Sequence, residues 1–113
     1  MSKERRRALP RIIEIDGLVL DSRLYRVARE GQLLTLNPTN IEILALLMRR
    51  SPQLVTKEDI AEILWGTREL KNPSGVGTRV HEIRKAVDEG FDEPLVHTVY
   101  RKGYLLGKNP YQA

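Results

Sequence analysis

The spacing of the hydrophobic residues divides this chain into a first part with strand-like patterns and a second part with helical ones. The first part contains short runs of branched apolar residues, separated by Asp-Gly, Asp-Ser and Glu-Gly pairs that are typical of tight turns. These runs predict a small antiparallel sheet of three or four strands. They cover residues 11–15, 18–20, 24–29 and 33–36.

Apolar residues recur at helical spacing from residue 41 onward. Asn37 is a good N-cap, and Pro38 fits the first helical position, where its missing N–H costs nothing. We predict that this helix spans residues 38–50, because the residue before Pro52 disfavours the helical backbone conformation.

Two further helices and a hairpin are predicted in the rest of the chain. The second helix begins after Thr56, which caps an acidic first turn, and ends near Gly66. The third helix is capped by Ser74 or a neighbour and runs to about Glu89. The hairpin strands are residues 95–100 and 104–106.

The third predicted helix has a narrow apolar stripe and an opposite polar face. Residues at helical spacing share a face, so the stripe must lie in the core. The polar side chains are long enough to reach base edges, and a basic hairpin tip follows them, which predicts a recognition helix with a wing. The stripe comprises Val76, Val80, Ile83 and Val87, and the polar face comprises Ser74, Thr78, His81, Glu82 and Lys85.

The chain of 113 residues is about the size of one domain. It has 19 Lys and Arg against 15 Asp and Glu, and its pI near 9.6 is compatible with a polyanionic partner. Much of the positive surplus lies in residues 1–11, which we expect to form a flexible basic arm or linker remnant. We expect the folded domain at residues 12–107 and a C-terminal tail at 108–113.

Several function classes lack support in the sequence. The chain has no cysteine, which excludes disulfides and cysteine-based zinc sites and favours an intracellular, cytoplasmic protein. Its apolar runs are far shorter than the roughly 20 residues that a membrane span needs. Neither histidine has a metal-spaced partner, and no nucleophilic triad pattern is visible. We therefore expect no enzymatic activity, no metal, no cofactor and no membrane contact.

Five sequence blocks, in order and at plausible spacings, carry a resemblance to a known family. The chain resembles the OmpR/PhoB-type winged-helix effector domain of bacterial response regulators. The hairpin block, with Thr-Val followed by Gly-Tyr, is the most specific of the five. The blocks are residues 36–40, 54–60, 65–66, 80–87 and 97–104.

The resemblance implies an α+β fold of the winged helix-turn-helix type, with a four-stranded antiparallel N-terminal sheet, three helices and a C-terminal β-hairpin wing. It also implies that the third helix enters the major groove of double-stranded DNA and that the wing touches the minor groove or the backbone. Such domains often bind tandem half-sites in promoters as the output half of a two-component system. A receiver domain would precede this segment if the chain is an excised effector domain; the chain could also be a stand-alone regulator or the N-terminal cytoplasmic part of a longer protein. RNA polymerase is a further candidate partner, through residues 66–73.

The chain departs from the family pattern in two places. Asn37 and Asn40 stand where the family commonly has Thr and Glu, which weakens the reciprocal capping box of the first helix. The wing has Tyr-Arg-Lys-Gly-Tyr instead of Arg-Gly-Val-Gly-Tyr, so its basic group is displaced along the hairpin.

The residues expected to contact DNA form three groups. Thr78, His81, Glu82 and Lys85 are the candidate base-reading residues. Ser74, Arg79, Arg84 and Thr98 are the candidate backbone contacts. Tyr100, Arg101 and Lys102 are the candidate wing contacts.

Two alternatives remain open from the sequence. The polar helix face could be an ordinary solvated surface, or the domain could be a protein-interaction module that uses its helix and wing against a protein partner. Arg79 or Arg84 could instead pair with Asp88 or Glu89. We expect the acidic run 88–93 to be a solvated turn away from DNA, and the single tryptophan, Trp65, to be a core residue.

Overall fold

The N-terminal sheet consists of four antiparallel strands in the order β1-β2-β3-β4. The structure is a computed structural model that describes residues 11–72 and 74–108. Two-residue turns join the outer strand pairs, and Asp16 and Gly17 in the first have positive φ angles of 51° and 86°, as such hairpin turns require. The strands are β1 Ile12–Ile15, β2 Leu18–Asp21, β3 Arg26–Arg29 and β4 Gln32–Leu34.

The three predicted helices are present: α1 Pro38–Arg50, α2 Lys57–Trp65 and α3 Gly75–Val87. The Asn37 side chain accepts the Asn40 N–H at 2.8 Å and caps α1. At α3 the prediction is only partly right. Ser74 occupies the cap position but its hydroxyl donates to Asn72, and the helix ends at Val87, two residues earlier than predicted.

A second sheet lies at the C-terminal side of the chain. Its strands are β5 Val55–Thr56, β6 Val96–Val99 and β7 Gly103–Leu106, in the order β5-β7-β6. The sequence predicts no strand at β5, because two residues between a loop and a helix cap have no recognisable period. Pairing with β7 makes this segment a strand.

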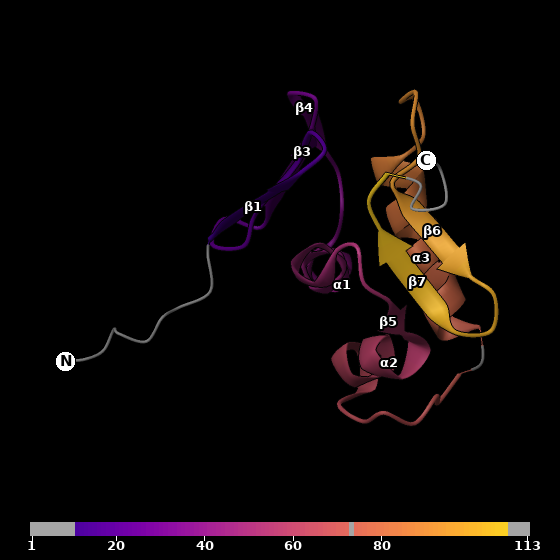
Figure 1. Cartoon of the computed structure of the whole chain (residues 1–113). Coiled ribbons are helices and arrows are strands. Elements are labelled where there is room, and N and C mark those ends of the chain that lie inside the picture. The colour runs from indigo at the N-terminus through magenta and orange to yellow at the C-terminus, as the bar shows by residue number, and fades with distance from the viewer. Residues whose placement is uncertain (1–10, 73, 109–113) are drawn as a thin grey trace.

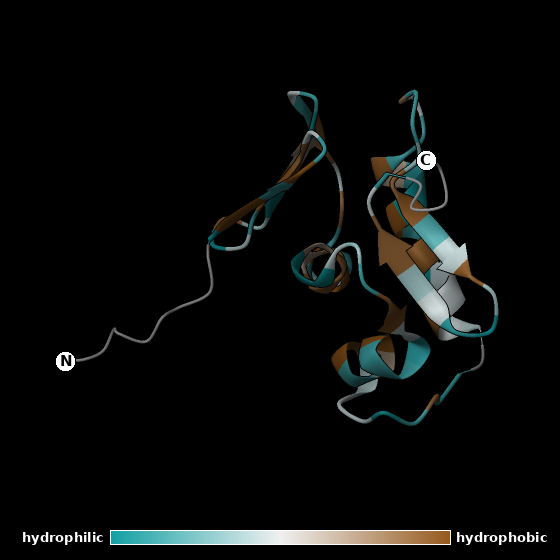
Figure 2. Cartoon of the chain, viewed as in Figure 1, coloured by the Kyte–Doolittle hydropathy of each residue, from teal (hydrophilic) through white to brown (hydrophobic). Residues whose placement is uncertain are grey.

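Helix α1 lies between the N-terminal sheet on one side and α3 with its hairpin on the other (Figure 1). It contacts β1, β7, α2 and α3, so it is the centre around which the core forms. Hydrophobic residues make up much of α1 and the end of β7, whereas the connection between α2 and α3 is mostly hydrophilic (Figure 2). The fold is a winged helix-turn-helix, as the sequence predicts.

Some expectations fall on residues that the structure does not describe. The basic arm at 1–11 lies outside the described residues except for Arg11, whose carbonyl accepts the Ser22 N–H at 2.7 Å. Of the tail at 108–113, only Lys108 is described. Within residues 11–72 and 74–108, no helix is long and apolar enough to cross a membrane.

Asp59 fixes the start of α2. Its carboxylate accepts the Thr56 N–H at 3.0 Å, completing a reciprocal capping box, and it pairs with Arg50 at 2.6 Å. A second guanidinium, that of Arg68, lies 2.9 Å away. Partial burial alone would raise the pKa of Asp59, but these hydrogen bonds outweigh it and hold the pKa well below its usual range.

We predict that Asp59→Asn lowers the free energy of unfolding at pH 7 by about 1–2 kcal/mol. Because the folded pKa lies below the unfolded value of about 3.9, the stabilisation is complete above that value and is lost as the pH falls towards the folded pKa. The free energy of unfolding, measured with urea between pH 7 and pH 2, should therefore fall more steeply with decreasing pH for the wild type than for Asp59→Asn. Glu58→Gln, in the same helical turn, is the control and should keep the wild-type slope. Parallel curves for wild type and Asp59→Asn would contradict the assignment.

Candidate nucleic-acid interface

Helix α3 presents one polar face to solvent. Its apolar stripe is buried as predicted, with Val76, Val80, Ile83 and Val87 each at most 2% exposed. The opposite face, which comprises Ser74, Thr78, His81, Glu82 and Lys85, is exposed. The sequence prediction of the two faces is therefore confirmed, while contact of this face with DNA remains a prediction.

A shallow hollow of about 440 Å³ lies beside the second half of α3. His81, Arg84 and Lys85 line one part of it, and Asp88 and Glu89 line the end near the helix C-terminus. Of the two carboxylates at this end, only that of Glu89 is exposed, because the Asp88 side chain is 9% exposed and pairs with Arg29. The basic side chains of the hollow, Arg84 and Lys85, lie in the last turn of α3.

The side chain of Glu82 is held by a hydrogen bond that the sequence did not predict. One of its carboxylate oxygens, Oε1, accepts a hydrogen bond from Nδ2 of Asn40 at 2.8 Å. Asn40 belongs to α1 and is only 2% exposed, and its Oδ1 lies 3.5 Å from a guanidinium nitrogen of Arg79. Sequence reasoning did not identify Asn40 as a site residue. The only signal was its departure from the family pattern at this position of α1.

Arg84 connects α3 to the wing. Its guanidinium donates to the hydroxyl of Thr98 at 2.8 Å and its Nε donates to the carbonyl of Val96 at 3.3 Å. Neither Asp88 nor Glu89 is its partner, in contrast to the alternative left open by the sequence. Two candidate backbone contacts, Arg84 and Thr98, are thus brought together, and the Thr98 hydroxyl keeps its own proton for donation.

The wing tip is cationic and exposed. Tyr100 is 78% exposed, and the guanidinium carbon of Arg101 lies 5.2 Å from the centre of its ring. The Lys102 N–H donates to the carbonyl of Val99 at 2.9 Å and closes the turn, in which Arg101 has a φ of 63°. All three predicted wing residues therefore lie at an exposed turn next to α3.

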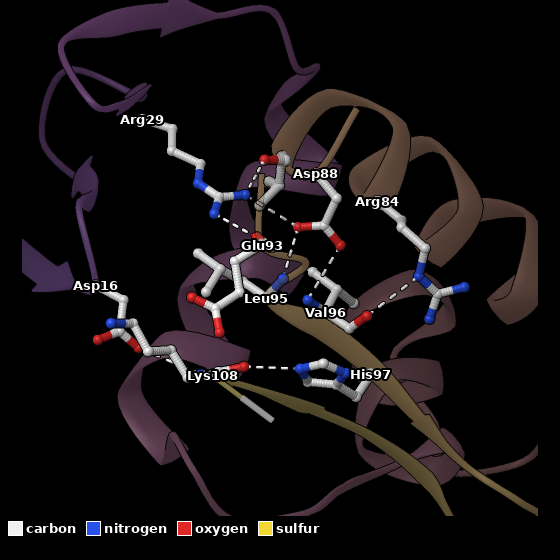
Figure 3. Close-up of polar contacts among 11 residues, drawn as sticks. Asp16, Arg29, Arg84, Asp88, Glu93, Leu95, Val96, His97 and Lys108 are labelled. Atoms are coloured by element: carbon white, nitrogen blue, oxygen red, sulfur yellow. Dashed lines mark hydrogen bonds and ion pairs between the residues drawn. The ribbon is translucent and has the colours of Figure 1, made fainter. Parts of the chain in front are cut away.

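A buried arginine that the sequence analysis did not identify holds the end of α3. Arg29 of β3 is 2% exposed and donates to the carbonyl of Val87 at 2.8 Å, while it also pairs with Asp88 at 3.3 Å. Figure 3 shows it reaching across to Asp88 and to the backbone carbonyl of Glu93. The Phe91 ring stacks on the guanidinium at 4.7 Å.

The expectation of a solvated acidic turn at 88–93 is wrong for Asp88. Its side chain is 9% exposed, and besides Arg29 it accepts the backbone N–H groups of Leu95 and Val96 at 2.8 and 3.2 Å. The pattern of charges in sequence cannot show this, because the partner arginine lies 59 residues earlier. Asp88 therefore joins the end of α3 to the start of the hairpin.

The comparisons with known proteins identify the family. The model described as "Transcriptional regulatory protein, C terminal" matches residues 31–106. The chain belongs to this family, and its resemblance to OmpR/PhoB-type effector domains is confirmed. Within the described residues, no group of three or more histidine or acidic side chains could hold a metal ion.

Individual relatives agree with this assignment. The chain is 31% identical over 97 residues to the transcriptional regulatory protein HprR of Escherichia coli (strain K12), a match that covers 86% of this chain and 44% of HprR. The chain therefore spans less than half the length of this curated relative. Its structure is similar to that of the DNA binding domain of CpxR from E. coli, with a TM-score of 0.76, 26% identity and coverage of 88% and 98%. The response regulator DrrB, described as a Thermotoga maritima OmpR/PhoB homolog, matches with a TM-score of 0.74 and 26% identity over 86% of this chain and 44% of DrrB.

Gly103 allows β7 to approach β5 closely. Substitution at this position tests whether that approach holds the wing in place. A Cβ atom there would lie 2.1 Å from the carbonyl oxygen of Val55, and the φ of 154° also favours glycine. We predict that Gly103→Ala lowers the free energy of unfolding by about 2–4 kcal/mol. Gly77→Ala is the matched control: nothing lies within 4 Å of its Cβ, so stability should be unchanged or rise by up to about 1 kcal/mol. Equal effects of the two substitutions in urea unfolding would show that the close approach does not constrain the wing.

Proposed function

We propose that this domain binds double-stranded DNA in a sequence-specific manner and serves as the output domain of a two-component response regulator. The observation that carries the proposal is the exposed polar face of α3 beside a cationic hairpin tip, on a helix whose opposite side is buried. A helix of this kind fits the major groove, and polar side chains on its outer face can read base edges.

Each group of residues has its own role in this proposal. Thr78, His81, Glu82 and Lys85 read bases, because they lie on the exposed face of α3. Ser74, Arg79, Arg84 and Thr98 lie at the margins of that face or at the base of the wing and contact phosphates. Tyr100, Arg101 and Lys102 form the wing contact, where the two cations add affinity without reading sequence.

The wider context is also part of the proposal. If this segment belongs to a longer chain, a receiver domain is its partner there; the curated relative HprR is more than twice as long as the matched segment. Two domains bind tandem half-sites about one helical turn apart in a promoter, in the cytoplasm. RNA polymerase is approached through residues 66–73, of which 66–72 form an exposed, mostly hydrophilic connection (Figure 2). The proposal includes no enzymatic step.

A protein-interaction function is the weaker alternative. Such a surface is usually apolar at its centre. The exposed face of α3 is instead polar and charged, so no observation on this helix favours a protein partner over DNA.

We predict that DNA binding depends strongly on salt. If about four to six cationic groups neutralise phosphates, the slope of log K against log salt should be about −4 to −5 per bound domain. Arg101→Gln combined with Lys102→Gln should weaken binding to all duplexes and flatten the slope by up to about two, whereas His81→Ala should reduce discrimination at one or two base pairs.

Arg23→Gln combined with Arg26→Gln provides the control for the wing variant. It removes the same charge from exposed positions in the β2–β3 turn and at the start of β3, in a sheet that lies across α1 from α3 (Figure 1), and should leave the slope unchanged. The measurement is a set of binding isotherms on selected and single-mismatch duplexes at several salt concentrations. An affinity for DNA that does not depend on salt would refute the proposed interface. So would an equal loss of affinity in the Arg23→Gln, Arg26→Gln control and in the wing variant.

A further inference from the structure

The buried amide of Asn40 bridges two side chains of α3 that are one helical turn apart. Its Nδ2 donates to Glu82 and its Oδ1 faces Arg79. We propose that Asn40 is a positioning residue that determines which atom Glu82 presents to DNA, and thereby sets base preference at one position of the site. This inference rests on the proposed DNA-binding function.

The orientation of the Asn40 amide is determined by its surroundings. A guanidinium supplies only donors and a carboxylate supplies only acceptors, so the amide oxygen must face Arg79 and the amide nitrogen must face Glu82. Asn40 is 2% exposed, and its backbone N–H is bound to the side chain of Asn37 at 2.8 Å. The amide therefore has one favourable orientation and cannot turn towards solvent.

The bond to Asn40 limits what Glu82 can offer to a base. Its Oε1 is occupied by the amide, while the residue as a whole is exposed on the outer face of α3. The second carboxylate oxygen is then the atom available to the groove, and it is an acceptor. Acceptors match the exocyclic amino groups of cytosine and adenine in the major groove. The hydrogen bond from Asn40 also holds the Glu82 carboxylate in place near the DNA phosphates, which would otherwise repel it.

Two isosteric substitutions, each of which exchanges a carboxylate and an amide, distinguish this positioning role from a structural one. In Glu82→Gln, the Gln oxygen would accept from Asn40, which leaves the Gln amide nitrogen as a donor towards the groove. Adding Asn40→Asp reverses this: the new carboxylate would bind the Gln nitrogen and leave the Gln oxygen as an outward acceptor. The double variant should therefore present the same kind of atom as the wild type.

The experiment is selection from a random duplex pool with the full chain as wild type, Glu82→Gln and the double variant. At one position, we expect the wild type and the double variant to prefer a base with an exposed amino group. Glu82→Gln alone should prefer guanine or thymine, which offer acceptors, with a change of about tenfold in relative affinity. Identical preferences for Glu82→Gln and the double variant would overturn the inference, as would an unchanged preference in all three proteins.

The free protein supplies a readout that does not depend on DNA. In NMR spectra of the wild type, the Asn40 side-chain amide protons should exchange slowly with water, and Glu82→Ala should accelerate that exchange. Fast exchange in the wild type would overturn the inference even if DNA binding is established. Slow exchange without any sequence selection by the wild type would instead refute the proposed function, and with it the role of Asn40 in base preference. The Glu82→Gln variant leaves the buried residue intact, so its predicted change of preference can be tested even if Asn40→Asp fails to fold.

Discussion

The buried ion pair between Arg29 and Asp88 joins the two sheets through the end of α3. Burying a guanidinium costs several kcal/mol unless its donors are satisfied. Here the cost is offset by the carbonyls of Val87 and Glu93, the Asp88 carboxylate and the face of Phe91. Only Nε of Arg29 lacks a hydrogen-bond partner among the buried side-chain atoms of the described residues. Removal of either partner would leave a buried charge unpaired.

The same contacts set the geometry of the proposed DNA-binding surface. Asp88 binds the first backbone N–H groups of the hairpin, and Arg84 binds Thr98 further along it. Helix α3 and the wing are therefore held at a fixed angle by polar bonds from two successive helical turns. A preorganised helix and wing lose less conformational entropy on binding, so more of the contact energy contributes to affinity.

Local sequence patterns predict most of the helices and strands and the two faces of α3. They do not predict the polar contacts between residues that are distant in sequence. The bounds of α1 follow from Asn37, Pro38 and Pro52, and the buried stripe follows from helical periodicity alone. The two-residue strand β5 exists only through pairing with β7, and the Asn40 to Glu82 bond spans 42 residues. Such contacts depend on how the helices and strands pack, and the spacing of residues along the chain does not indicate which buried polar groups will pair.

Hydrogen exchange in wild type and Arg29→Met tests the central claim most directly. If the Arg29 pair holds the hairpin to α3, the backbone N–H groups of Leu95 and Val96, which bind Asp88, should lose protection well beyond the change in global stability. Amides within α2 should change only as much as global unfolding does. A uniform change across the described residues, or unchanged protection at Leu95 and Val96, would contradict the claim that this buried pair positions the wing.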